Sequence, residues 1–108
     1  MNKKRRNELT KLVSRLEAID PANEKDEVED IIEDIISDLE LIKSEEENAF
    51  DNMPENLQGS MRGSESEEAI DNMDSAIDSL EDALDAEDAD ELDDLISDAV
   101  SYIEDAAM

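Results

Sequence analysis

Aliphatic side chains recur every three or four residues along most of the chain, and this spacing constrains the fold more than any other feature. The first such series consists of Leu9, Leu12, Leu16 and Ile19. At 3.6 residues per turn, this spacing places the side chains on one face of an α-helix. The series predicts a helix over residues 3–19 that ends before Pro21, because proline disfavours helical geometry in the residue before it.

A second and longer series predicts a helix over residues 24–51. Its members are Val28, Ile32, Ile35, Leu39 and Ile42, followed one heptad later by Ala49. Ile31 and Ile36 widen the apolar face beyond the seam of a two-stranded coiled coil. We therefore expect this helix to contact more than one neighbouring helix.

The second half of the chain carries two further series, which predict helices over residues 65–85 and 88–106. The apolar positions are Ile70, Met73, Ile77, Leu80 and Leu84, then Leu92, Leu95, Ile96, Ala99, Val100 and Ile103. Residues 85–91 contain no Gly or Pro, so the sequence allows either a stutter in one long helix or a tight turn. Asp88 and Glu91 resemble a capping box that lacks the usual Ser or Thr.

Residues 52–64 form the predicted connector between the two halves, and they hold both Gly and one of the two Pro. Pro54 lacks an amide hydrogen and stops the second helix, while Gly59 and Gly63 permit a compact turn. The apolar residues around this segment are expected to pack against the helix ends: Phe50, Met53, Leu57 and Met61. The alternative is a recognition loop that includes Arg62.

These elements predict a single all-α domain over residues 1–108. Its form would be an antiparallel helical hairpin or a three- to four-helix bundle with coiled-coil-like packing. The residues expected in the core or in an oligomer interface are Ile32, Ile35, Leu39, Ile42, Ile70, Met73, Ile77, Leu80 and Leu84. A homodimer is also expected to be possible, since the helices are long and their apolar faces wide.

The residue types exclude most catalytic and metal chemistry. The chain has no Cys and no His, which removes thiol nucleophiles, the usual zinc sites and the commonest proton-transfer group. The acidic segments lack the Gly of a calcium-binding EF-hand loop, and no Gly-rich phosphate loop is present. We therefore expect no enzyme activity, no cofactor and no dedicated metal site.

The first residues, MNKKRR, are basic, but no long apolar run follows them. This pattern does not match a secretory signal, and no segment has the length of apolar residues that a membrane span needs. We expect a cytoplasmic protein without a membrane partner. A nucleic-acid-binding arm is the other interpretation of the basic start, but pairing of these cations with the many acids of the chain is favoured.

Charge is unevenly distributed along the sequence. The chain carries 35 acidic and nine basic residues, a net charge of −26 at pH 7. Six of the bases lie in the first fifteen residues, whereas eighteen acids and no base follow Arg62. Such a chain repels nucleic acid and attracts basic proteins.

The density of these acids matches that of nucleic acid. Eighteen acids occur in the 41 residues from Glu65 to Asp105, which at a rise of about 1.5 Å per helical residue gives about one charge per 3.4 Å. A hairpin of the same segment would have about one charge per 1.7 Å. A single strand and a duplex of DNA carry charges at about these two intervals.

We therefore predict a nucleic-acid mimic that occupies the basic groove of a nucleic-acid-binding protein and does not itself bind nucleic acid. The candidate partner-binding residues are Asp71, Asp74, Asp78, Glu81, Asp82, Asp85, Asp88, Asp90, Asp93, Asp94 and Asp98. Five of them form a row at helical spacing with no Lys or Arg between them: Asp71, Asp74, Asp78, Asp82 and Asp85. The alternative is a structural, assembly or chaperone protein that acts through helix–helix oligomerisation.

Three segments, KKRRNEL, EEENAFDNMPENLQGSMRG and AIDNMDSAIDSLEDALD, resemble a group of small uncharacterised acidic proteins of tailed bacteriophages of Gram-positive bacteria. The likeness covers residues 3–16 and about 45–84. It implies a phage protein that works in the cytoplasm of a host cell. In that setting, acidic helical proteins often resemble DNA mimics, so the expected target is a restriction or CRISPR effector.

Overall fold

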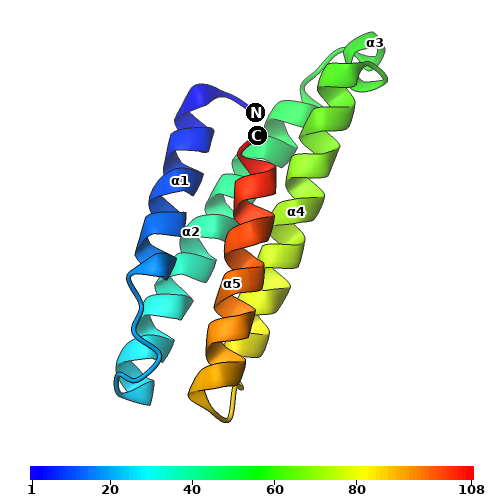
Figure 1. Cartoon of the computed structure of the whole chain (residues 1–108). Helices are drawn as coiled ribbons and strands as arrows, with labels where there is room; N and C mark the ends of the chain where they lie inside the picture. Colours follow the sequence, from blue (N-terminus) through cyan, green and yellow to red (C-terminus); the bar gives the residue numbers. More distant parts are fainter.

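The computed structural model describes all 108 residues, which form five helices and no strands. Helix α1 spans Lys3–Glu17, α2 Lys25–Asp51, α3 Glu55–Gln58, α4 Met61–Leu84 and α5 Ala89–Ala106. The four long helices run alternately in opposite directions, and the single turn of α3 caps one end (Figure 1). The two termini lie at this same end. The predicted all-α class is confirmed, in its four-helix form.

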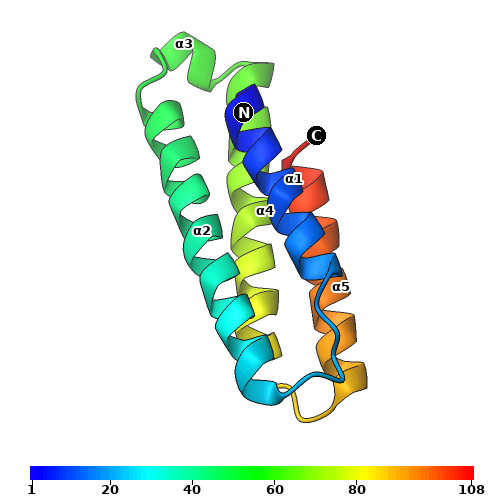
Figure 2. The same cartoon turned by 90° about the vertical axis from the view of Figure 1, so that its left-hand side faces the viewer.

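The long helices form a ring in which each packs against two others. Helices α1 and α4 each contact both α2 and α5, and the two views agree on this arrangement (Figure 2). The most extensive contact joins α4 to α5. Small buried residues lie in these two helices: Ala69, Ala76, Ala83, Ala99 and Ala106. Their size permits a close approach of the two backbones.

One continuous core of eighteen buried apolar residues runs through the bundle. Seven of the nine residues predicted for the core or an oligomer interface belong to it: Ile32, Ile35, Leu39, Ile42, Met73, Ile77 and Leu80. Leu84 is half-buried and packs against this core, whereas Ile70 is half-buried without packing against it. The apolar faces of the helices therefore pack against one another within a single copy of the chain.

Residues 85–91 form a turn followed by the start of α5, which settles the choice left open by the sequence. Asp88 is the N-cap of α5, and its Oδ1 accepts a hydrogen bond from the Glu91 backbone N–H at 2.7 Å. The Glu91 carboxylate accepts from the backbone N–H of Glu87 at 3.2 Å, not from that of Asp88 as in a standard capping box. The cap is therefore made by acids alone, at a helix end where the dipole favours them.

The connector is shorter and more helical than predicted. Helix α4 begins at Met61, about four residues early, with Ser60 in the N-cap position. The other long helices begin and end within two residues of the predicted bounds. The side-chain amide of Gln58 secures the connector, because it donates to the carbonyl oxygens of Phe50 at 3.0 Å and Met53 at 3.2 Å.

The expected apolar plug at the connector forms only in part. Phe50 and Met53 are half-buried. Leu57 is 37% exposed, however, and Met61 is 78% exposed. Met61 lies two residues before the buried Gly63 of α4 and therefore on the opposite side of this helix, so its side chain points outward and does not fold under the helix ends as predicted.

Gly63 is required for close packing and not, as the sequence suggested, for a permissive turn. No residue of the chain has a positive φ angle. Gly63 is buried within α4, and a Cβ atom there would lie 2.0 Å from the carbonyl oxygen of Gln58. At Gly59 the nearest atom to an added Cβ would be 3.9 Å away. The missing side chain of Gly63 therefore lets α3 lie against α4.

Replacing Gly63 with Ala should destabilise the bundle by about 1–3 kcal/mol, because backbone atoms of Gln58 must move to make room. Urea unfolding followed by circular dichroism measures this change. Gly59→Ala is the matched control, and we expect it to be neutral or stabilising by up to about 1 kcal/mol. Equal stability of the two variants would contradict the packing role of Gly63.

Candidate functional site

The eleven acids predicted to bind a partner are all exposed. On α4, three of them point directly away from the core. Asp78, for example, lies two residues from both Ala76 and Leu80, which are fully buried. Two residues correspond to about 200° around a helix, so Asp78 faces the opposite side. Asp71 and Asp82 have the same relation to apolar neighbours two residues away on either side.

Helix α5 repeats this arrangement beside α4. Asp94 lies two residues from Leu92 and Ile96, and Asp98 two residues from Ile96 and Val100, all of which are buried or half-buried. These carboxylates also point away from the core. We call the outward residues Asp71, Asp78, Asp82, Asp94 and Asp98 the acidic face.

Cations are concentrated on the other half of the bundle. Helices α1 and α2 carry eight of the nine basic residues. Several pair with acids of the same two helices: Lys4 with Glu8 at 4.0 Å, Arg15 with Asp38 at 2.8 Å, Lys25 with Glu29 at 3.9 Å and Lys43 with Glu47 at 3.7 Å. No residue of the acidic face makes an ion pair. Helix α1 thus has more basic than acidic residues, whereas α2 has twelve acids and two bases, and several acids of α2 have no ion-pair partner either.

Asp74 departs from the uninterrupted acidic row that the sequence predicted. Lys43 reaches across from α2 and pairs with the Asp74 carboxylate. The hydrogen bond from the Lys43 ammonium to Asp74 raises the pKa of Lys43 above its ordinary value. Partial burial opposes this rise in pKa, and the negative charges of Asp74 and Glu47 add to it. The sequence could not show this pairing, because the two residues are 31 positions apart. Asp74 is therefore left out of the acidic face.

The hairpin of α4 and α5 brings the acids to a density close to that of duplex DNA. Its longer helix has 24 residues, a length of about 36 Å. Eighteen acids lie in the hairpin from Glu65 to Asp105, which gives about one charge per 2 Å of its length, against about 1.7 Å for the duplex. The charge interval of the folded hairpin is therefore closer to that of duplex DNA than to that of a single strand.

A buried carboxylate, which the sequence analysis missed, ties three helices together at the end that carries the termini. Glu46 of α2 is 1% exposed. Its Oε2 accepts from Arg5 Nε of α1 at 2.8 Å, and its Oε1 accepts from Ser66 Oγ of α4 at 2.7 Å. The backbone nitrogen of Met1 lies 3.6 Å from Oε1. No buried side-chain polar atom of the chain lacks a hydrogen-bond partner.

The balance of forces at Glu46 favours its ionised form. Burial alone would raise the pKa of this carboxyl. The hydrogen bond from Ser66, the charge of the N-terminal ammonium and the hydrogen bond and charge of Arg5 outweigh that effect, so the pKa lies below its ordinary value. A sequence signal for this site did exist. Glu46 follows Ile42 by four residues and so continues the apolar stripe of α2.

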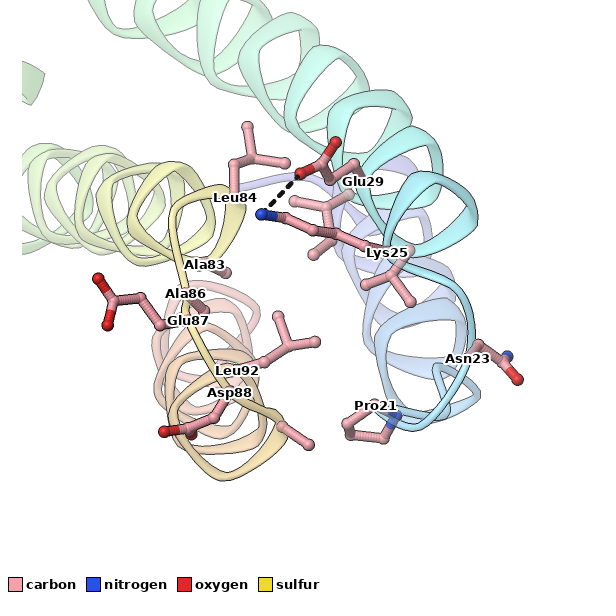
Figure 3. Close-up of a pocket in the computed structure, with 13 residues that line it drawn as sticks. Pro21, Asn23, Lys25, Glu29, Ala83, Leu84, Ala86, Glu87, Asp88 and Leu92 are labelled. Atoms are coloured by element: carbon pink, nitrogen blue, oxygen red, sulfur yellow. Dashed lines mark ion pairs between the residues drawn. The ribbon is translucent and has the colours of Figure 1, made fainter.

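At the opposite end of the bundle, a hollow of about 160 Å³ opens between the start of α2 and the turn from α4 to α5. Figure 3 shows Leu84 and Leu92 beside it and the ion pair between Lys25 and Glu29, both of α2, at its edge. Its inner wall is apolar and includes Val28, Ile32 and Ala83. Its lining contains no hydroxyl, thiol or imidazole side chain.

The structure contains no group of three or more metal-ligating side chains placed to hold a metal ion. None of the helices has the length and apolarity that crossing a membrane requires. Comparisons with protein-family models, with curated proteins and with solved structures find no match for this chain.

Replacing Glu46 with Gln should lower the free energy of unfolding at pH 7 by about 2–3 kcal/mol, because Arg5 loses its buried partner charge. Since the pKa of Glu46 is depressed by folding, its contribution is present above the unfolded value and is lost as the pH falls through the folded value. The stability gap between wild type and variant should therefore shrink below about pH 4.5. Chemical denaturation from pH 3.5 to 7 measures it.

Glu33→Gln is the control, since Glu33 is exposed on the same helix and makes no ion pair. Removing this charge from a polyanion should leave stability unchanged or slightly increased at pH 7. A Glu46→Gln variant as stable as Glu33→Gln at neutral pH would contradict the stabilising role of the cluster.

Proposed function

We propose that this chain is a non-enzymatic binding protein that imitates nucleic acid and occupies the basic groove of a nucleic-acid-binding protein. One observation carries the proposal. The five carboxylates of the acidic face point outward from two closely packed helices and have no ion-pair partner, while the cations lie mainly on the other two helices.

The separation of the unpaired acids on α4 and α5 from most of the cations supports a function, because this separation does not stabilise the fold. Helices gain stability from opposite charges four residues apart, and α1 and α2 use such pairs: Lys4 with Glu8, Lys25 with Glu29 and Lys43 with Glu47. Helix α5 has none, and the one cation of α4, Arg62, makes none. The hairpin of α4 and α5 thus accepts self-repulsion that a few Lys residues would relieve, and the result is a strong negative field over these two helices.

The proposed target is a defence protein of a bacterial host, such as a restriction or CRISPR effector, in the host cytoplasm. This choice rests on the resemblance of the sequence to phage proteins. Duplex DNA would compete with the chain for such a target and would not bind the chain itself, since both are polyanions. The alternative of a scaffold or chaperone acting through the apolar stripes is less favoured, because those stripes are buried within one copy.

A competition experiment tests the proposal. The purified chain is immobilised, and heparin-binding proteins from a bacterial lysate are passed over it. We expect captured proteins to be released by duplex DNA and by added salt. The triple variant Asp71→Asn, Asp78→Asn, Asp82→Asn should bind them about 10- to 100-fold more weakly, on the basis of about 0.5–1 kcal/mol for each surface charge pair lost.

The matched control removes the same number of charges from another face. Asp30→Asn, Glu33→Gln and Asp34→Asn lie on exposed positions of α2 and make no ion pairs. This variant should bind almost as tightly as wild type. Equal weakening of both triple variants would show attraction to bulk charge only and would contradict mimicry, as would captured proteins that duplex DNA fails to release.

A further inference from the structure

A second hollow, of about 500 Å³, lies where the start of α1, the end of α2 and the start of α4 meet. This is the end of the bundle that carries the termini (Figure 1). Three of the nine cations of the chain line it: Arg5, Arg6 and Arg62. The hollow is thus a local concentration of guanidinium groups in a protein whose net charge is −26.

Arg5 is held in place with donors to spare. Its Nε donates to the buried Glu46 carboxylate at 2.8 Å, and its side chain is 15% exposed. Its two Nη groups donate to no protein acceptor. Because no fully buried side-chain nitrogen lacks a hydrogen-bond partner, these Nη groups are not completely buried. Glu46 therefore fixes the Arg5 guanidinium and leaves its outer edge free.

Arg6 and Arg62, unlike Arg5, are not held by any carboxylate of the chain. Both are exposed, and neither makes an ion pair or a side-chain hydrogen bond as donor. The chain offers 35 carboxylates as partners, yet these two residues from α1 and α4 meet at one hollow without one. Their donors are available to an external anion.

We propose that this hollow binds the phosphate group of a small phosphomonoester. The planar fork of a guanidinium matches two phosphate oxygens at once, which a Lys ammonium cannot do. Arg5 is already positioned by Glu46, so binding loses little of its side-chain freedom. The hollow exceeds the size of a phosphate ion, and Ala49 and Met53 supply an apolar wall for the organic part of the ligand.

Two carboxylates also line the hollow and set the expected strength of binding. Glu46 is compensated by Arg5, whereas Glu65 is exposed and makes no ion pair. Glu65 therefore opposes an incoming anion, whereas exposed acids more than about 8 Å from the hollow are largely screened at physiological ionic strength. This site differs from the acidic face in place and in ligand, and it does not depend on the function proposed above.

Titration calorimetry and backbone amide NMR test the site, with inorganic phosphate in one arm and phenyl phosphate in another. Ionic strength is held constant with sodium chloride, so that general screening does not change. We expect saturable binding that shifts the amides around Arg5 and Arg62. Phenyl phosphate should bind several-fold more tightly than inorganic phosphate because of the apolar wall. Equal or weaker binding of phenyl phosphate would overturn the phosphomonoester assignment.

Three variants decide whether the arginines are responsible. The double variant Arg6→Gln, Arg62→Gln should weaken binding at least fivefold. Lys11→Gln with Lys25→Gln removes the same charge away from the hollow and should leave binding unchanged. Glu65→Gln should tighten it. Non-saturable binding, or equal weakening in the two double variants, would overturn the proposal, and circular dichroism confirms that each variant is folded.

Discussion

Burial of aliphatic side chains must outweigh the mutual repulsion of 35 carboxylates in a chain of 108 residues. Eighteen apolar residues form a single core along a bundle 49 Å long, and nearly every acid lies outside it. The length of the bundle spreads the charges apart, and salt screens the repulsion between exposed charges that are more than about 8 Å apart. The fold is therefore possible only with helices whose apolar and acidic residues separate cleanly onto opposite faces.

Three of the nine cations, Arg5, Arg15 and Lys43, join two helices by an ion pair. Arg5 and Lys43 each link two helices, one by reaching the buried Glu46 and the other by reaching Asp74. Ser66 brings α4 into the first of these contacts. The negative charges of the outer α4 and α5 surface are left without partners as a result. The placement of the few cations thus accounts both for the ion pairs between helices and for the unpaired carboxylates of the acidic face.

The sequence predicted the four long helices closely because hydrophobic periodicity determines which face of a helix is buried. It could not choose between a stutter and a turn at residues 85–91, since the cap depends on the backbone geometry of Asp88 and Glu91. The Glu46 cluster was not predicted, because a charged residue there occupies an apolar position of the helix. Its hydrogen-bond partners, Arg5 and Ser66, lie 41 and 20 positions away in the sequence. The outward direction of the acids followed from the same periodicity, but the Lys43 contact to Asp74 did not.

The central claim is that the folded chain holds a continuous negative potential over α4 and α5 and a much weaker one over α1. Residue-specific NMR relaxation with a cationic and a neutral nitroxide cosolute measures this potential directly. The account predicts that enrichment of the cationic probe over the neutral one is greatest at amides near Asp71, Asp78, Asp82, Asp94 and Asp98 and is smallest near Lys3, Arg6 and Lys11. Uniform enrichment over all four long helices would contradict it.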